Sequence, residues 1–146
     1  MITTPKSYEV WKEFIKTWKI WYRASEKNLI NLGISTVEYR ILKNLYERGP
    51  LPMIELANIN MVTQGWITGV VDKMEKNGYV KRDRSQNDRR VINISITEKG
   101  IEFFKHIAEL HLNYIDMTLQ DFTDYDMNEM IKLLQRVQEN VNKLSE

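Results

Sequence analysis

Residues 84–100 decide the fold. They run R-S-Q-N-D-R-R-V-I-N-I-S-I-T-E-K-G, from Arg84 to Gly100. A polar tip rich in arginine precedes a short segment in which isoleucine alternates with polar residues, and a helix start follows at Thr97. Alternation with a period of two predicts a strand with one buried and one solvated face. Residues 90–96 are therefore expected to pair with residues 79–83 as a two-stranded ribbon, with the loop 84–89 at its tip.

The tip of this ribbon is basic. Its cations are Lys81, Arg82, Arg84, Arg89 and Arg90, and its two acidic residues are Asp83 and Asp88. Arginine in a narrow minor groove gains from the negative potential there, so the ribbon is suited to nucleic acid. Asp88 would be repelled by phosphate, and we expect it to accept hydrogen bonds from an arginine and hold the loop in shape. A solvated charge cluster is the alternative interpretation.

The residues before the ribbon predict two helices joined by a tight turn. Residues 52–59 and about 62–77 have helical patterns, and the second ends at Gly78 just before a strand. This is the spacing of a helix-turn-helix, in which the start of the second helix contacts base edges. The candidates for that contact are Thr63, Gln64, Gly65, Trp66 and Thr68. A small helical hairpin with an exposed polar face is the alternative.

The candidates differ in how each could contact DNA. Gln64 can pair bidentately with adenine, and the two threonines can reach a phosphate or a thymine methyl group. Gly65 lets the backbone approach closely, at a cost in helix stability. For Trp66 we favour packing beneath its helix over contact with the sugar-phosphate backbone.

Amphipathic helices flank this central part. A wide apolar stripe at helical period runs from Tyr8 to Ile30. The residues S-T-V-E at 35–38 predict a capping box, with the Glu38 carboxylate returning to the cap. The helix opened there is expected to stop at Gly49-Pro50.

Two further helices are expected after the ribbon. Thr97 caps the first, and Thr123 to Asp126 has the spacing of another capping box. In the last helix apolar residues recur at intervals of 3, 4, 3, 4 and 3 from Met127 to Leu144, which favours a dimer seam over an ordinary bundle core.

Composition and motifs exclude several functions. With 146 residues, 42% hydrophobic and 28% charged, the chain fits one globular domain. It has no cysteine, no secretory signal and no membrane-length apolar run, so a cytoplasmic location is expected. His106 and His111 are five apart rather than at zinc-pair spacing, and no P-loop, GxGxxG or nucleophile elbow occurs. We expect no enzyme, metal or cofactor.

Residues 51–100 resemble the winged helix-turn-helix of the MarR family of bacterial and archaeal transcription regulators. The motifs are E-L-A at 55–57, V-T-Q-G at 62–65, V-D-K-M-E-K-N-G-Y-V at 71–80, D-R-R at 88–90 and T-E-K-G at 97–100. The flanking helices match in order and length, so the resemblance extends over nearly the whole chain. Trp66 is bulkier than the residue usual there, and Tyr79 stands where leucine is common.

The resemblance implies a mainly α fold with a small β-ribbon, in a single domain of residues 1–146. Residues 35–100 would form the winged helix-turn-helix, and residues 1–33 and 97–146 the flanking dimerisation helices. It also implies a sequence-specific transcription regulator that binds a pseudo-palindromic site on double-stranded DNA as a homodimer.

Many members of the family release DNA when a small phenolic or lipophilic anion binds. The residues that would hold such an aromatic effector here are Tyr22, Arg23, Tyr39 and His111. A surface salt bridge is the alternative role for Arg23, and a core or interface position for His111. Two alternative functions are a winged-helix protein-interaction module without DNA binding and a protein that does chemistry on a bound ligand.

Overall fold

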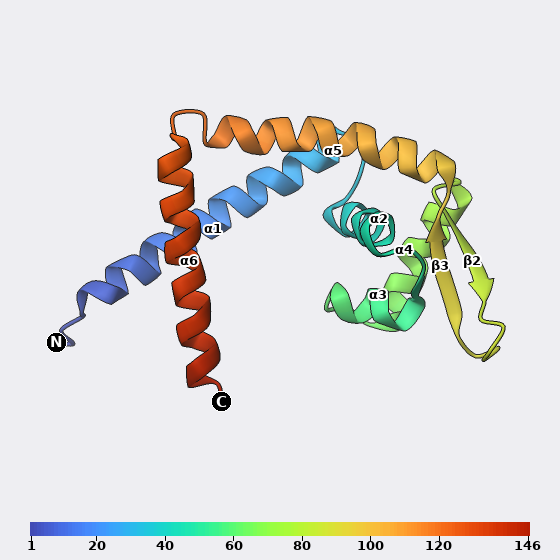
Figure 1. The fold of residues 1–146 in the computed structure, drawn as a ribbon, viewed down its shortest axis with the longest axis horizontal. Helices are drawn as coiled ribbons and strands as arrows, with labels where there is room; N and C mark the ends of the chain where they lie inside the picture. Colours follow the sequence, from blue (N-terminus) through green and yellow to red (C-terminus); the bar gives the residue numbers. More distant parts are fainter. The chain divides into compact units, whose positions relative to one another are not determined.

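The computed structural model describes residues 1–146, which form six helices and three short strands (Figure 1). The elements are α1 (Lys6–Asn31), α2 (Thr36–Arg48), β1 (Leu51–Pro52), α3 (Met53–Ile59), α4 (Gln64–Lys76), β2 (Val80–Arg84), β3 (Ile92–Ile96), α5 (Glu98–Thr118) and α6 (Asp124–Leu144). The chain divides into two compact units, residues 1–112 and 113–146. None of the helices combines the length and apolar character that crossing a membrane requires.

The core of the first unit is built from aliphatic side chains of the central helices and the sheet. Its fully buried members include Ile41, Leu42, Leu45, Leu56, Ile67, Val71, Met74, Val80 and Ile94. On α2 and α4 these positions recur three or four residues apart, so each helix turns one face inward, as the periodicity predicts.

The predicted helix ends are largely confirmed. Gly49, with φ of 80°, ends α2, and Thr123 and Asp126 exchange both bonds of a capping box at the start of α6. The expected box at α2 is half formed. The Glu38 amide donates to the Ser35 hydroxyl at 3.1 Å, but the Glu38 carboxylate lies 3.5 Å from Lys73 Nζ on α4. The Lys73 ammonium group thus takes the place of the Ser35 amide as the partner of the Glu38 carboxylate.

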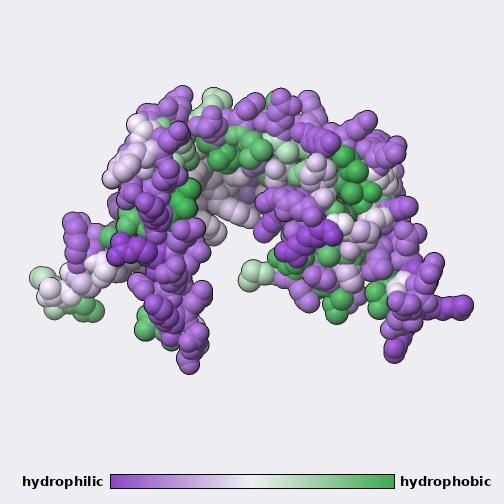
Figure 2. Space-filling model, viewed as in Figure 1, coloured by the Kyte–Doolittle hydropathy of each residue, from purple (hydrophilic) through white to green (hydrophobic).

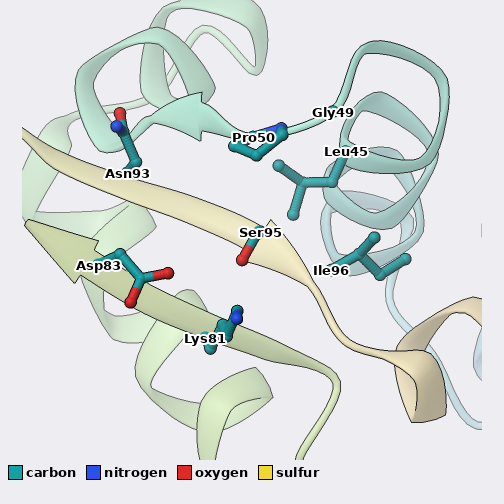
Figure 3. Close-up of a pocket in the computed structure, with 8 residues that line it drawn as sticks. All are labelled: Leu45, Gly49, Pro50, Lys81, Asp83, Asn93, Ser95 and Ile96. Carbon is teal, nitrogen blue, oxygen red and sulfur yellow. The ribbon is translucent and has the colours of Figure 1, made fainter. Parts of the chain in front are cut away.

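The sheet has one more strand than the predicted ribbon. Strand order is β1-β3-β2, all antiparallel, with Leu51 paired to Ile94 and Arg82 paired to Ile94 from the other side. The face of β3 that carries Asn93 and Ser95 was expected to be solvated, but both residues are half-buried. They line a depression of about 470 Å³ beside the end of α2 (Figure 3). The residues around it are Leu45, Gly49, Pro50, Lys81, Asp83, Asn93, Ser95 and Ile96.

Thr97 joins the end of the sheet to the end of α4. Its hydroxyl donates to the Gly78 carbonyl at 2.6 Å, and its amide donates to the Tyr79 carbonyl at 3.0 Å. The same hydroxyl accepts from the Gly100 amide at 3.0 Å, so Thr97 caps α5 as predicted. Lys99 adds a bond from its Nζ to the Asn77 carbonyl at 2.7 Å. The T-E-K-G motif is therefore the junction of α4, β2 and α5.

Gly100 is needed at this junction because no side chain fits there. The residue is buried, and a Cβ atom would overlap the Tyr79 carbonyl oxygen and lie 2.8 Å from Ile96 Cγ1. The Tyr79 ring stacks on Phe103 with 4.3 Å between ring centroids. The glycine thus lets α5 pass directly over the start of β2.

We expect Gly100→Ala to lower the free energy of unfolding by about 3 kcal/mol, because the added methyl group overpacks a site walled by backbone. The matched control is Gly69→Ala in α4, where a Cβ meets nothing within 4 Å. That change should raise stability by about 1 kcal/mol through helix propensity. Urea unfolding of the three proteins measures both effects, and equal stabilities would contradict the proposed role of Gly100.

Candidate nucleic-acid interface

The start of α4 presents the predicted contact residues. Thr63 is the N-cap, and its hydroxyl accepts from the Trp66 amide at 3.2 Å, so the helix begins two residues later than the pattern suggested. Gln64 and Gly65 form the exposed first turn. The Thr68 hydroxyl donates to the Gln64 carbonyl at 2.7 Å. Both threonine hydroxyls therefore make bonds within the helix, while the Gln64 side chain extends into solvent.

The expectation that Trp66 packs beneath its helix is wrong. The residue is 50% exposed, and its neighbour Ile67 is completely buried. Adjacent residues in an α-helix point about 100° apart, so the position that buries Ile67 turns Trp66 to the side. The large indole consequently lies on the surface beside Gly65.

The wing loop, residues 85–91, is held by its own hydrogen bonds. The Ser85 amide donates to the Val91 carbonyl at 2.9 Å, and the Val91 amide donates to the Asp88 carbonyl at 3.0 Å. Arg84 Nη1 donates to the Arg89 carbonyl oxygen at 2.8 Å. The hairpin extends beyond α3 and α4 in Figure 1, and its tip is hydrophilic in Figure 2.

Asp88 has the bracing role that the sequence predicts. Its carboxylate accepts from the Arg90 side chain at 3.1 Å (Nε) and 3.3 Å (Nη2), and from the Arg90 amide at 3.0 Å. These bonds, the side-chain ones first, hold the pKa of the Asp88 carboxyl below its usual value. The pair fixes the direction of Arg90, whose side chain is otherwise in solvent, and the exposed Arg89 side chain makes no ion pair.

Arg82 has a structural role that the sequence did not reveal. Its guanidinium pairs with Asp72, lies 3.9 Å from the Glu75 carboxylate, and reaches the Thr68 carbonyl at 3.5 Å. The Arg82 amide also donates to Glu75, at 3.2 Å. The sequence did contain a signal for this role, because Asp72 and Glu75 lie three residues apart on α4 and an arginine follows in the next strand. The residue ties α4 to the wing.

The helix and the wing meet at one depression of about 250 Å³. Gln64 and Thr68 contribute from α4, and Arg90 contributes from the wing. The full lining is Pro52, Met53, Ile54, Gln64, Thr68, Arg82, Arg90, Val91 and Ile92. By contrast, Lys81 lies on the opposite face of the sheet, beside Asp83 (Figure 3). The basic residues of the ribbon are thus divided between two faces.

The candidate effector residues fall into two groups. The rings of Tyr39 and His111 pack edge to face at 5.4 Å between centroids. His111 is buried, and Asn28 Nδ2 donates to its Nδ1 at 3.0 Å, while its Nε2 lies 3.2 Å from the Ser25 hydroxyl. Burial lowers the pKa of His111 and raises that of Tyr39, the latter with a further contribution from Glu47. The neutral imidazole suits this arrangement.

The other two candidates lie along α1. Tyr22 stacks on Trp18 with 5.3 Å between ring centroids. Arg23 is exposed and lines a depression of about 460 Å³ whose walls all come from α1. Its lining residues are Tyr8, Trp11, Lys12, Ile15, Lys16, Lys19, Ile20 and Arg23.

Comparisons with known proteins agree with this geometry. The family model described as "MarR family" matches residues 34–92. The chain is 32% identical over 115 residues to the HTH-type transcriptional regulator YpoP of Bacillus subtilis, covering 79% of this chain and 82% of that protein. It is 32% identical over 111 residues to the regulator MhqR of the same organism, covering 76% and 77%. The MarR family regulator Sco3205 of Streptomyces coelicolor, solved in complex with DNA, matches with a TM-score of 0.78 at 25% identity, covering 96% of this chain and 90% of that one.

A helix-turn-helix followed by a β-hairpin wing defines the protein class as a winged helix-turn-helix regulator. The chain belongs to the MarR family of transcription regulators, as the motifs in residues 51–100 predicted. It is a regulator rather than an enzyme.

Proposed function

We propose that this chain is a sequence-specific regulator that binds double-stranded DNA as a homodimer, and that a small aromatic anion modulates the binding. The observation that carries the proposal is the depression shared by Gln64, Thr68 and Arg90. A single partner bound there would contact both α4 and the wing. The chain's similarity to a family member that was solved with DNA supports the same partner.

In this proposal α4 contacts the major groove. Gln64 is the polar side chain free to pair with a base edge, and the exposed backbone at Gly65 can approach the groove closely. Thr63, Trp66 and Thr68 lie beside them, where they can contact the sugar-phosphate backbone or apolar base edges.

The wing supplies the cations. Arg84 at the end of β2 and Arg89 and Arg90 in the wing loop are exposed, and Asp88 and the backbone hold this loop in shape. An arginine fixed before binding loses less conformational entropy when it meets a phosphate or the minor groove. A protein-interaction module without DNA binding is the alternative function, and a DNA titration separates the two.

The homodimer is proposed because two helices have apolar faces that one chain leaves in solvent. On α6 no residue is buried, and the exposed apolar positions include Leu134, Val137, Val141 and Leu144. On α1 they include Val10, Trp11, Phe14 and Trp18. Exposed apolar surface of this extent marks an interaction site, and the 3.5-residue repeat of α6 suits another helix.

The effector is proposed to bind near Arg23. The depression along α1 combines the aromatic walls of Tyr8 and Trp11 with several cations, which suits an aromatic body bearing one negative charge. The Tyr39–His111 cluster, with Tyr22 on the adjoining helix, is the second candidate region for this ligand.

We expect Arg90→Ala to weaken binding to all duplexes alike and to reduce the slope of log affinity against log salt concentration by about two, one for each wing of the homodimer. Gln64→Ala should instead change the preferred base, at a cost of about 1–3 kcal/mol for the original duplex. Anisotropy titrations at several salt concentrations separate these effects. The control is Lys132→Ala on α6, which removes one charge outside the interface and should leave both quantities unchanged. An unaltered affinity of Arg90→Ala would exclude the wing's role.

Val137→Lys should raise the dissociation constant of the dimer by more than about 100-fold, because each copy would bury an unpaired charge in the seam. Gln135→Lys adds the same charge at an exposed position of α6 away from the seam and serves as the matched control. Sedimentation equilibrium measures the dimer dissociation constant of both variants. A wild-type chain that sediments as a monomer at micromolar concentration would contradict the proposed assembly.

A substituted benzoate should release bound DNA at lower concentration than the neutral benzamide of the same shape, since the site selects for negative charge. Arg23→Ala should reduce this difference. DNA release followed by anisotropy provides the measurement, and equal potency of the two compounds on the wild-type protein would exclude an anion site.

A further inference from the structure

The turn between α3 and α4 ends α3 with a Schellman motif. The Val62 amide donates to the Ala57 carbonyl at 3.1 Å, and the Met61 amide donates to the Asn58 carbonyl at 3.1 Å. The residue at the centre of this motif takes a positive φ, and Met61 has a φ of 56°. Glycine occupies such positions without strain, whereas methionine is strained by its Cβ.

The same motif ends two other helices of this chain, and both use glycine. Gly33 (φ 96°) follows α1, with the Ile34 amide bonded to the Leu29 carbonyl. Gly78 (φ 81°) follows α4, with the Tyr79 amide bonded to the Met74 carbonyl. Met61 is the exception, and burial does not compensate its strain because the residue is 91% exposed. Folding alone therefore gives no reason for a methionine at this turn.

Trp66 follows Met61 by five residues along the chain. It lies in the first turn of α4, just after the Met61 turn, and is half exposed. The hydroxyls of Thr63 and Thr68 make bonds to the helix backbone. Next to the exposed Gln64 side chain, the beginning of the recognition helix therefore presents two large exposed apolar groups, although this end of the helix faces base edges in helix-turn-helix proteins.

Among the base edges of the major groove, the one large apolar feature is the C5 methyl group of thymine. We infer that Met61 and Trp66 form an apolar surface that recognises thymine methyl groups at the operator. The inference rests on the proposed DNA binding and adds a chemical preference to it. The strained backbone at Met61 is retained because the side chain contacts DNA rather than the protein core.

Replacing thymine by deoxyuridine removes the methyl group and leaves base pairing intact, so it tests the inference directly. A duplex selected by the wild-type protein from a random pool is remade with single deoxyuridine substitutions. We expect wild-type affinity to fall about fourfold for each contacted methyl group. Met61→Gly and Trp66→Ala should each bind thymine and deoxyuridine duplexes more nearly alike at the positions they contact.

Two controls keep the result interpretable. Met61→Gly relieves the positive φ, so its melting temperature should rise, and weaker discrimination then cannot come from unfolding. At the same positions, 5-methylcytosine should be bound more tightly than cytosine by the wild-type protein only, because both bases pair with guanine and differ only by the methyl group.

The outcomes distinguish this inference from the proposed function. Failure of the wild-type protein to bind any duplex would refute DNA binding and the inference with it. Binding that ignores every deoxyuridine substitution would refute methyl recognition and leave DNA binding standing. Discrimination that both variants retain in full would assign methyl recognition to other residues and refute the role of Met61 and Trp66.

Discussion

The close approach of Gly100 to the Tyr79 carbonyl is the constraint on which the interface depends. It brings the start of α5 over the end of α4 and the beginning of β2, and Thr97 then bonds to Gly78 and Tyr79. Three elements thereby share one fixed point. Arg82 adds a second connection, from the wing to Asp72 and Glu75 of α4. With two connections between them, the helix and the wing hold one relative orientation before any partner arrives.

Charge is distributed so that positioning and contact fall to different arginines. Arg82 is neutralised by two carboxylates and acts on the fold, while Arg89 makes no ion pair and is exposed. Arg90 has an intermediate role because Asp88 orients it without removing it from solvent. A basic stretch in a sequence therefore does not count directly as contact residues, since part of its charge holds the scaffold in shape.

Local signals made most of this fold predictable from the sequence. Capping residues, glycine at helix ends and the isoleucine alternation each involve neighbours within a few positions. The features that the sequence did not predict are contacts between residues far apart in the chain or a very short strand. β1 has two residues and shows no periodicity, and the Arg82–Asp72 pair spans ten positions. The orientation of Trp66 depended on which neighbour is buried. Tyr39 and His111 were predicted in one site, but their contact is set by tertiary packing.

The absence of buried residues from α6 has a consequence for the lifetime of the protein. A helix without buried side chains gains little stability from its own chain, so α6 would be stabilised by the second copy proposed above. The stability of α6 then depends on the concentration of the protein, because a higher concentration favours the dimer. Newly made chains at low abundance would fray at residues 113–146 and offer a cleavage site to proteases. Turnover would remove unpaired subunits and spare assembled ones, which sharpens the threshold of copy number at which repression or activation begins.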